Sequence, residues 1–316
     1  MTSSFEPDRE VAAAMSFGGN TETPVAADPR TWKSARTQLD IFYSLVTSEL
    51  PKHPEVVRVH QFTTVTPEGA ELTLHWFTSD SVTGAAVVQA HGGGRIAGRV
   101  EMFTPYLSDY VANSDVSILA VEYRLAPEVT GATPTEDVYA GLVWLVENAA
   151  QLGVDRSRIG LLGESAGGGL SAGVALLARQ NDIKIAGQML IYPMLDDRTR
   201  LADEYLAPYT EWIVEANRLG WDTLLGAARG TDEVSAIVAP GRNTDFSDLP
   251  RSYIEVGELD LFRDEAVKYA IGLWSAGVST ELHVLPGAQH GFDHWAPTAG
   301  ITNRAMQGRI AFLRSL

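Results

Sequence analysis

The chain has 316 residues, 45% of them hydrophobic, which is enough for one large domain with a substantial core and a small addition. Its net charge of −16 argues against a nucleic-acid partner, and the absence of cysteine excludes disulfides, thiolate catalysis and cysteine-bearing metal sites. No apolar stretch approaches the length of a membrane span and the first residues carry no leader pattern, so we expect a cytoplasmic protein without membrane association.

Eight short apolar or alternating runs predict β-strands. Turn-forming residues at 64–71 join the first two runs as a hairpin, and from there on helical patterns alternate with strand patterns. This alternation predicts an α/β fold whose mostly parallel sheet is covered by helices on both faces. The expected strands lie near 55–65, 70–78, 84–90, 116–122, 157–162, 186–192, 251–256 and 279–285, and the expected helices near 101–113, 135–150, 166–180, 262–276 and 301–315.

Two segments interrupt this alternation, residues 1–54 and 196–240. We expect them to form a small helical cap on a catalytic core made of residues 55–195 and 241–316. The second segment carries Tyr209 and Trp212 among aliphatic residues at helical spacing. This helix either packs as an accessory element or lines an acyl or alcohol pocket.

A histidine and three glycines follow the third expected strand, at residues 91–94. Glycines let the backbone come close to a ligand, and peptide N–H groups aimed at a developing oxyanion stabilise it by about 3 kcal/mol each. We assign the N–H groups of Gly93 and Gly94 to such a hole, and we expect His91 to hold the loop by hydrogen bonds. Neither dinucleotide-binding nor phosphate-loop spacing is present, which disfavours a phosphate cradle.

The pattern Gly-x-Ser-x-Gly follows the fifth expected strand, at residues 163–167, and leads into a helix of small residues. This arrangement is typical of a nucleophile elbow, in which the serine is held at the tip of a tight strand-to-helix turn. Ser165 would be the nucleophile, and the N–H of Ala166 would join the oxyanion hole at the helix N-terminus.

Acidic residues follow the strand expected near 251–256, where an α/β sheet places site residues. We select Asp260 as the acid of the site, with Glu258 and Asp264 as alternatives. Asp264 is also explained as an acidic residue in the first turn of the next helix.

Of seven histidines, His290 stands in a loop after the last expected strand, at the same sheet edge as Ser165 and Asp260. It is our choice for the base, with His294 as the competitor. Imidazole suits this role because its ordinary pKa is close to neutral. The remaining histidines have structural interpretations: His60, His75 and His283 in strands, and His53 in a surface segment.

The order serine, acid, histidine is that of a known hydrolase type. In this interpretation His290 takes the Ser165 proton and Asp260 orients the imidazole ring. No metal or organic cofactor is required.

These motifs, together with Tyr123-Arg124-Leu125-Ala126-Pro127-Glu128 and His290-Gly291-Phe292, resemble the hormone-sensitive-lipase-like branch of the α/β-hydrolases, which includes bacterial family IV carboxylesterases. The resemblance spans residue 55 to the C-terminus. It implies an eight-stranded sheet, a helical cap and hydrolysis of small-molecule esters with short to medium acyl chains. It also implies the triad Ser165, Asp260 and His290 and an oxyanion hole at Gly93, Gly94 and Ala166. Many relatives form dimers through the last strand, so the resemblance is compatible with a homodimer.

The sequence departs from the family pattern at three places. Glu164 replaces the usual aspartate before the nucleophile, Arg95 replaces an aromatic residue after the glycines, and residues 261–262 alter the loop after the acid. Glu164 is expected to be a local hydrogen-bonding group beside the pocket. Arg95 either forms a structural ion pair, with Glu164, Glu101 or another nearby acid, or pairs in the pocket with a carboxylate or phenolate of the substrate.

The sequence is compatible with two further functions. The same machinery serves lactone or amide hydrolysis, and a ligand receptor built on an inactive hydrolase is the non-enzymatic alternative.

Overall fold

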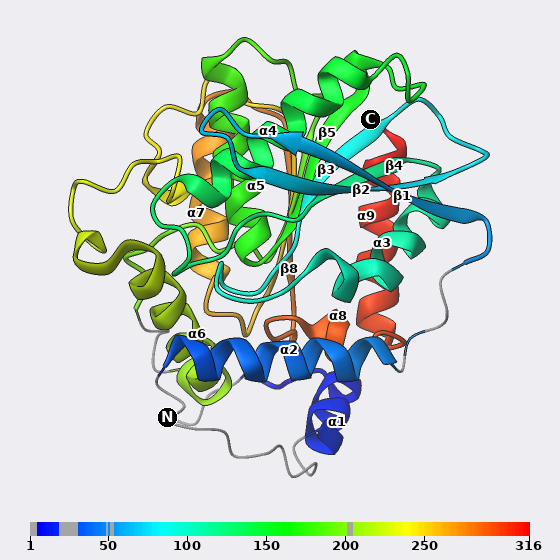
Figure 1. Cartoon of the computed structure of the whole chain (residues 1–316). Helices are drawn as coiled ribbons and strands as arrows, with labels where there is room; N and C mark the ends of the chain where they lie inside the picture. Colours follow the sequence, from blue (N-terminus) through cyan, green and yellow to red (C-terminus); the bar gives the residue numbers. More distant parts are fainter. Residues whose placement is uncertain (1–4, 19–30, 49, 51–53, 201–204) are drawn as a thin grey trace.

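One eight-stranded sheet organises the protein in the computed structural model (Figure 1). The structure describes residues 5–18, 31–48, 50, 54–200 and 205–316, without the side chains of 16–18, 48, 211 and 212. The strands are β1 (Val57–Val65), β2 (Glu71–Ser79), β3 (Ala86–Ala90), β4 (Ser117–Val121), β5 (Ile159–Glu164), β6 (Gln188–Ile191), β7 (Ser252–Gly257) and β8 (Thr280–Leu285).

The strand order is β1-β2-β4-β3-β5-β6-β7-β8, and it explains where a site can form. Strands β1 and β2 form the expected hairpin, β2 also runs antiparallel to β4, and all other neighbours are parallel. The carboxyl ends of β3, β5, β7 and β8 therefore open toward the same edge, where α/β sheets bind ligands.

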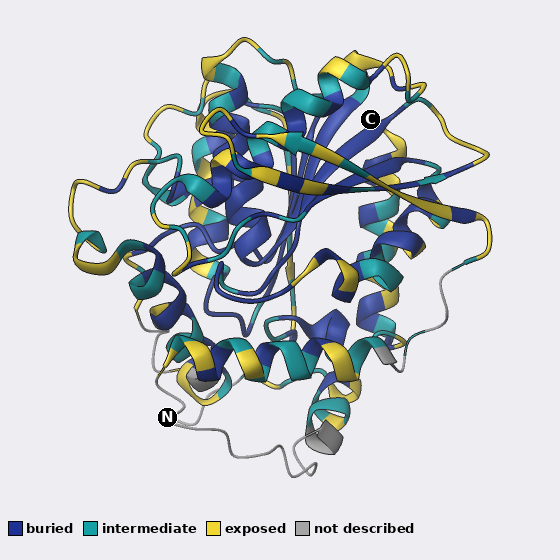
Figure 2. Ribbon diagram, in the orientation of Figure 1, coloured by how far each residue is buried: buried dark blue, intermediate teal, exposed yellow. Residues whose placement is uncertain are grey.

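Helices cover both faces of this sheet, as the alternation predicts. In Figure 1, α4, α5 and α7 lie on one side and α3 and α9 on the other. Every residue of β3, β4, β5, β6 and β7 is buried, as in a sheet covered on both faces (Figure 2). The helices are α1 (Arg9–Gly18), α2 (Trp32–Ser48), α3 (Val100–Ser114), α4 (Thr133–Asn148), α5 (Ala166–Gln180), α6 (Ala207–Leu225), α7 (Arg263–Ser275), α8 (Phe292–Trp295) and α9 (Gly300–Arg314).

The segments that interrupt the alternation supply α1, α2 and α6. Helix α2 contacts α3 and α6, and α1 contacts α8, so these helices gather beyond the carboxyl edge of the sheet (Figure 1). We propose that they act as the cap expected for residues 1–54 and 196–240. In the described part of the chain, no helix is long and apolar enough to cross a membrane.

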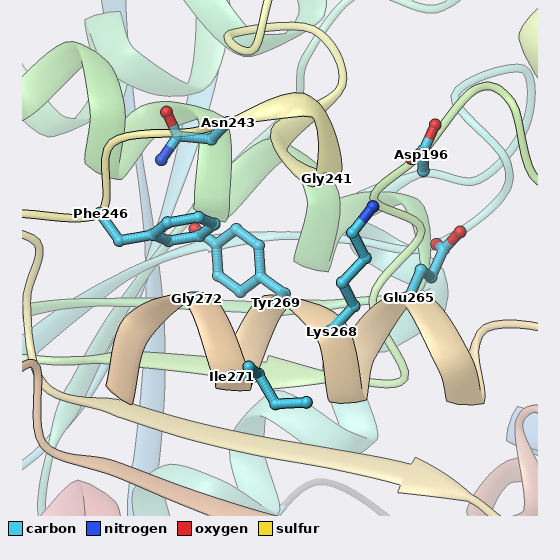
Figure 3. A pocket seen from close by; sticks show the side chains of 9 residues that line it. All are labelled: Asp196, Gly241, Asn243, Phe246, Glu265, Lys268, Tyr269, Ile271 and Gly272. Atoms are coloured by element: carbon cyan, nitrogen blue, oxygen red, sulfur yellow. The ribbon is translucent and has the colours of Figure 1, made fainter. Parts of the chain in front are cut away.

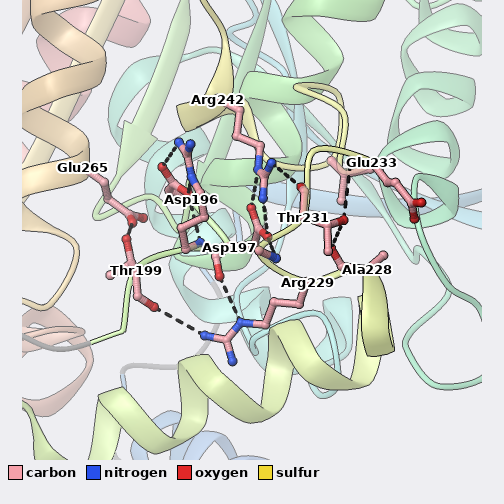
Figure 4. A network of polar contacts seen from close by, with 12 residues as sticks. Asp196, Asp197, Thr199, Ala228, Arg229, Thr231, Glu233, Arg242 and Glu265 are labelled. Carbon is pink, nitrogen blue, oxygen red and sulfur yellow. Dashed lines mark hydrogen bonds and ion pairs between the residues drawn. The ribbon is translucent and has the colours of Figure 1, made fainter.

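A polar network fixes the chain where it leaves β6 toward α6 (Figure 4). The buried Asp197 carboxylate accepts hydrogen bonds from Arg242 Nε and Nη2, at 2.6 and 2.8 Å. Arg229 Nε donates to the Asp197 carbonyl oxygen at 2.9 Å. On the other side, the carboxylate of Glu265 in α7 accepts from Leu195 N at 2.6 Å and from the Thr199 hydroxyl. Residues before and after α6 are thus tied to each other and to the core.

Candidate active site

Ser165 lies at the turn between β5 and α5, with φ 55° and ψ −120°. Such a left-handed conformation is strained for a residue with a side chain. The turn also requires glycine on both sides: a Cβ at Gly163 would lie 2.2 Å from Gly167 O, and one at Gly167 would lie 1.9 Å from Ala90 O. The sharp strand-turn-helix expected for this pentapeptide is therefore present.

Three side chains selected from the sequence meet at this turn. Ser165 Oγ lies 3.0 Å from His290 Nε2, and His290 Nδ1 lies 2.8 Å from Asp260 Oδ2. Asp260 is fully buried, and its second oxygen accepts a hydrogen bond from Phe262 N at 2.9 Å. Serine, imidazole and carboxylate thus form a continuous hydrogen-bonded chain, which can carry a proton from Oγ to Nε2.

The alternative residues have other contacts. His294 is buried in a cluster with the rings of Tyr43, Phe103 and Tyr106, and its Nδ1 has no hydrogen-bond partner among the described residues. Burial lowers the pKa of this imidazole. Glu258 accepts from Gly287 N at 3.1 Å, and Asp264 accepts from Arg263 Nε at 2.7 Å.

A buried network supports the imidazole of His290 from behind. The ring of Tyr192 contacts it edge-on, with centroids 4.8 Å apart, and Tyr192 Oη donates to Asp293 Oδ1 at 2.9 Å. Arg309 in α9 donates to Asp293 Oδ2 at 2.6 Å and to Glu255 Oε1 at 2.5 Å. Burial opposes ionisation of Asp293 most strongly, but the charges of Arg309 and His294 and the hydrogen bonds from Arg309 and Tyr192 together outweigh it and lower the Asp293 pKa to about 2. Because these contacts join distant segments, no local sequence pattern signals them.

The glycine loop after β3 is held as expected. Gly93 has φ 117°, and a Cβ there would lie 2.2 Å from Ala97 O, so only glycine fits. His91 Nδ1 lies 2.7 Å from Gly92 O, and Tyr123 Oη donates to His91 O at 2.9 Å. Burial lowers the pKa of His91 to about 4, so this imidazole stays neutral near neutral pH.

The backbone N–H groups expected to bind an oxyanion are those of Gly93, Gly94 and Ala166. Within the described residues, none of the three donates a hydrogen bond to the protein. Buried backbone donors are normally paired, so unpaired ones beside a serine are suited to bind an incoming acceptor. Ala166 is also the first residue of α5, where the helix dipole favours negative charge.

Glu164 has the local role that the sequence suggests. Its buried carboxyl accepts from Gln89 Nε2 at 3.3 Å and, with longer geometry, from Gly92 N at 3.4 Å. Burial, reinforced by the negative charge of Asp293, raises the pKa of Glu164 to about 8. The side chain thus connects β5 with β3 and with the glycine loop.

The raised pKa of Glu164 predicts a pH-dependent effect of Glu164→Gln on stability. Between pH 4.5, its ordinary pKa, and about pH 8, folded protein keeps a proton that unfolded chain has released. Stability therefore falls as pH rises through this range. The amide mimics the protonated acid, so Glu164→Gln should have a higher Tm than the parent at pH 9. This Tm difference should be larger at pH 9 than at pH 5. Thermal unfolding of both proteins at both pH values measures this; an equal Tm difference would contradict it.

Arg95 packs against the cap helix α6, and its expected role in substrate binding stays a prediction. It is fully buried, and among the described residues it forms no ion pair with Glu164 or Glu101, so the ion-pair interpretation is wrong for these partners. Its Nη1 donates to Val238 O at 2.9 Å, and its guanidinium lies over the Trp221 ring at 4.1 Å. The contacts of Arg95 are thus with α6 and the segment after it.

Of the cap residues, Tyr209 and Trp212 both lie in α6, but the side chain of Trp212 is outside the described residues. Tyr209 Oη donates to Phe5 O at 2.9 Å and so holds the N-terminal segment against α6. Tyr43 in α2 also lies at the site, although the sequence pattern did not indicate it. A Cβ at Gly92 would lie 3.2 Å from Tyr43 Oη and 3.5 Å from Ser165 Cβ, which places this hydroxyl beside the nucleophile.

A separate cavity of about 240 Å³ lies between α7 and the segment near 241–246 (Figure 3). Phe246 and Tyr269 line its apolar side, and Lys268 and Glu265 its polar side. None of the three hydrogen-bonded residues at the Ser165 turn lines this cavity. It is therefore distinct from the candidate site.

Comparisons with known proteins agree with this geometry. A family profile for the alpha/beta hydrolase fold matches residues 87–294. The chain is 35% identical to a carboxylesterase, NlhH, of Mycobacterium tuberculosis, over 66% of this chain and 67% of that protein. It is 31% identical to the esterase LipI of the same species, over 84% and 83%.

A solved structure of a bacterial heroin esterase is 32% identical and superposes with a TM-score of 0.87, covering 98% of this chain and 97% of that one. The esterase LipW of Mycobacterium marinum is 29% identical with a TM-score of 0.76, covering 90% and 88%. The elbow, the sheet order and these similarities agree, and the chain belongs to the α/β-hydrolase family, in its hormone-sensitive-lipase-like carboxylesterase branch.

Proposed function

We propose that this carboxylic ester hydrolase cleaves small-molecule esters with Ser165 as nucleophile, His290 as general base and acid, and Asp260 as the group that orients the imidazole. The observation that carries this assignment is the hydrogen-bonded chain from Ser165 Oγ through His290 to Asp260, at 3.0 and 2.8 Å. Asp260 favours the tautomer with a proton on Nδ1, which leaves Nε2 free to accept the serine proton.

In acylation, Ser165 Oγ attacks the carbonyl carbon of the ester while Nε2 of His290 takes the hydroxyl proton. The carbonyl π electrons move onto oxygen, and the N–H groups of Gly93, Gly94 and Ala166 bind the resulting oxyanion. When this intermediate collapses, the bond to the alcohol oxygen breaks and His290 returns the proton to the leaving alcohol.

In deacylation, water repeats the sequence on the acyl-enzyme. His290 takes a proton from water, the hydroxide attacks the acyl carbon, and the carboxylic acid leaves as the proton returns to Ser165 Oγ. These steps use no metal or organic cofactor.

We propose that the helices of segments 1–54 and 196–240 bound the substrate pocket. This is supported by Tyr43 of α2, whose hydroxyl lies beside Gly92, and by α6, which approaches the glycine loop. The substrates proposed for this pocket are esters with short to medium acyl chains, as the family resemblance implies. A homodimer through the edge strand β8 is part of the proposal, since this strand exposes Val284. A cytoplasmic location stays a prediction.

The test combines covalent labelling with a substrate panel. A fluorophosphonate should label the parent protein at Ser165, and peptide mass mapping identifies the modified residue. The panel compares p-nitrophenyl esters of increasing acyl length with lactones, anilides and heroin, the last because a structural relative carries that activity in its name. Faster turnover of lactones or anilides would reassign the substrate class, whereas absence of labelling and turnover would favour a ligand-binding protein.

A further inference from the structure

Arg95 is a buried cation that forms no ion pair with any carboxylate of the described residues. Its side chain has no exposed surface, and its Nε and Nη2 find no hydrogen-bond partner in the described part of the chain. Burial accordingly lowers the pKa of Arg95 to about 10, against the weaker opposing charges of Asp197 and Glu265. A buried, unpaired charge is expensive, so a purely structural role does not explain why arginine stands here.

The contacts of Arg95 join the glycine loop to the cap helix. The residue directly follows Gly94, and its backbone, at φ 65°, continues the tight turn of the loop. Its carbonyl accepts from Ala126 N at 2.9 Å. The guanidinium meanwhile lies 4.1 Å from the Trp221 ring centroid, a distance at which cation–π attraction is effective.

Helix α6 touches the same loop a second time. A Cβ at Gly220 would lie only 2.5 Å from Gly94 O, so the helix backbone rests directly on the loop. Gly220 and Trp221 are neighbours, so a single point of α6 meets both Gly94 and Arg95. The segment after α6 adds the third contact, from Val238 O to Arg95 Nη1.

The cap side of this junction is held in place. The network around Asp197, Arg229 and Arg242 binds the chain before and after α6 to one frame (Figure 4). Because α6 is held in this way, it would not move with the glycine loop. A displacement of the loop would therefore break the Arg95 contacts.

We propose that Arg95 is a positioning residue, which docks the oxyanion loop on α6 and so places the N–H groups of Gly93 and Gly94. The inference rests on the proposed function, because it assigns those groups to the oxyanion. Oxyanion stabilisation depends on donors aimed within a few tenths of an ångström, and losing one donor costs about 10²- to 10³-fold in kcat. A loosened loop should cost part of that factor.

The main test is Arg95→Met, which keeps the length of the side chain and removes its charge and planar donors. On p-nitrophenyl acetate we expect kcat to fall about 10- to 100-fold with KM within threefold, because the loss is confined to the transition state. Arg95→Lys, which keeps the positive charge and one donor nitrogen, should recover part of the loss. A trifluoromethyl ketone, whose hemiketal oxygen occupies the oxyanion hole, should bind more weakly by a factor similar to the loss in kcat.

Three variants test the junction from the side of α6. Gly220→Ala places a methyl group against Gly94 O and should lower kcat in the same manner. Trp221→Leu removes the ring under Arg95, whereas Trp221→Phe keeps an aromatic face and should stay within threefold of the parent. These milder changes keep the inference testable if Arg95→Met does not fold, which circular dichroism and thermal unfolding would reveal.

Arg251→Met is the matched control. Arg251 also lies over an aromatic ring, that of Phe312 at 4.7 Å, and also donates to a carbonyl, Ala186 O, but it precedes β7 at the opposite edge of the sheet. Its replacement should lower Tm while leaving kcat and inhibitor affinity within twofold. A purely structural role of Arg95 predicts the same result for Arg95→Met, and this result would overturn the inference.

Substrates of different charge distinguish a positioning role of Arg95 from a role in substrate binding. A positioning residue should give equal fold-losses in kcat/KM on a neutral ester and on one whose acyl group bears a carboxylate, both for Arg95→Met and for Arg95→Phe. A loss confined to the anionic ester would assign Arg95 to substrate binding and overturn the inference. Failure of the proposed function is distinguished by the parent protein alone, which would then lack fluorophosphonate labelling at Ser165.

Discussion

Ser165→Ala should lower kcat by about 10⁴- to 10⁶-fold while the fold stays intact. The hydroxyl is the atom that would form the acyl bond, and its removal leaves Nε2 of His290 with nothing to activate but water. The substitution adds no atoms, and alanine has the same backbone preferences at φ 55° as serine, so the turn keeps its geometry. Residual hydrolysis would come from the oxyanion loop and substrate binding.

This prediction is measured with p-nitrophenyl acetate turnover, fluorophosphonate labelling and thermal unfolding on the same preparation. Tm should stay within a few degrees of the parent, and labelling should disappear. Turnover within tenfold of the parent, in protein free of parent contamination, would show that another group is the nucleophile.

His290→Ala should produce a loss in kcat of similar size, and His294→Ala should not. His290 Nε2 is the ring nitrogen that faces Ser165 Oγ, so alanine removes the proton acceptor. His294 instead lies among the rings of Tyr43, Phe103 and Tyr106, and its removal leaves a cavity in an aromatic cluster. The second variant should therefore lose thermal stability and keep kcat within about tenfold of the parent.

The two histidine variants control each other, because each removes one imidazole, His290 from the loop after β8 and His294 from α8 just beyond it. Parallel measurement of kcat and Tm separates a chemical loss from a packing loss. Survival of turnover in His290→Ala together with its loss in His294→Ala would reverse the assignment of the base.

The sheet and the hydrogen-bonded triad of side chains were accessible from the sequence because each is signalled locally. Short apolar or alternating runs predict strands, and all eight were found with ends shifted by at most two residues. Ser165 directly follows β5, Asp260 and His290 lie in the loops after β7 and β8, and parallel strands bring their carboxyl ends to one edge. The antiparallel hairpin and the elbow were equally predictable, since turn chemistry is local.

Contacts between distant segments were not accessible in this way. The partner of Arg95 is the ring of Trp221, 126 positions later, and its pairing with Glu164 or Glu101 looked natural only because those acids are near in sequence. Tyr43 stands in an ordinary amphipathic helix, and nothing in its neighbourhood reveals that it reaches the turn of Ser165. The side of a helix that faces a site depends on how the helix packs against distant segments. The periodicity of its own sequence does not reveal those segments.

Through the buried guanidinium of Arg309, helix α9 supports the loop that carries His290. The guanidinium neutralises two carboxylates that come from different places, Asp293 beside the loop and Glu255 in β7. Without α9, both buried carboxylates would lose this counter-charge, a state that costs several kcal/mol per ion. A version of the chain cut between α8 and α9 should therefore regain hydrolysis only when the missing helix is supplied as a separate peptide.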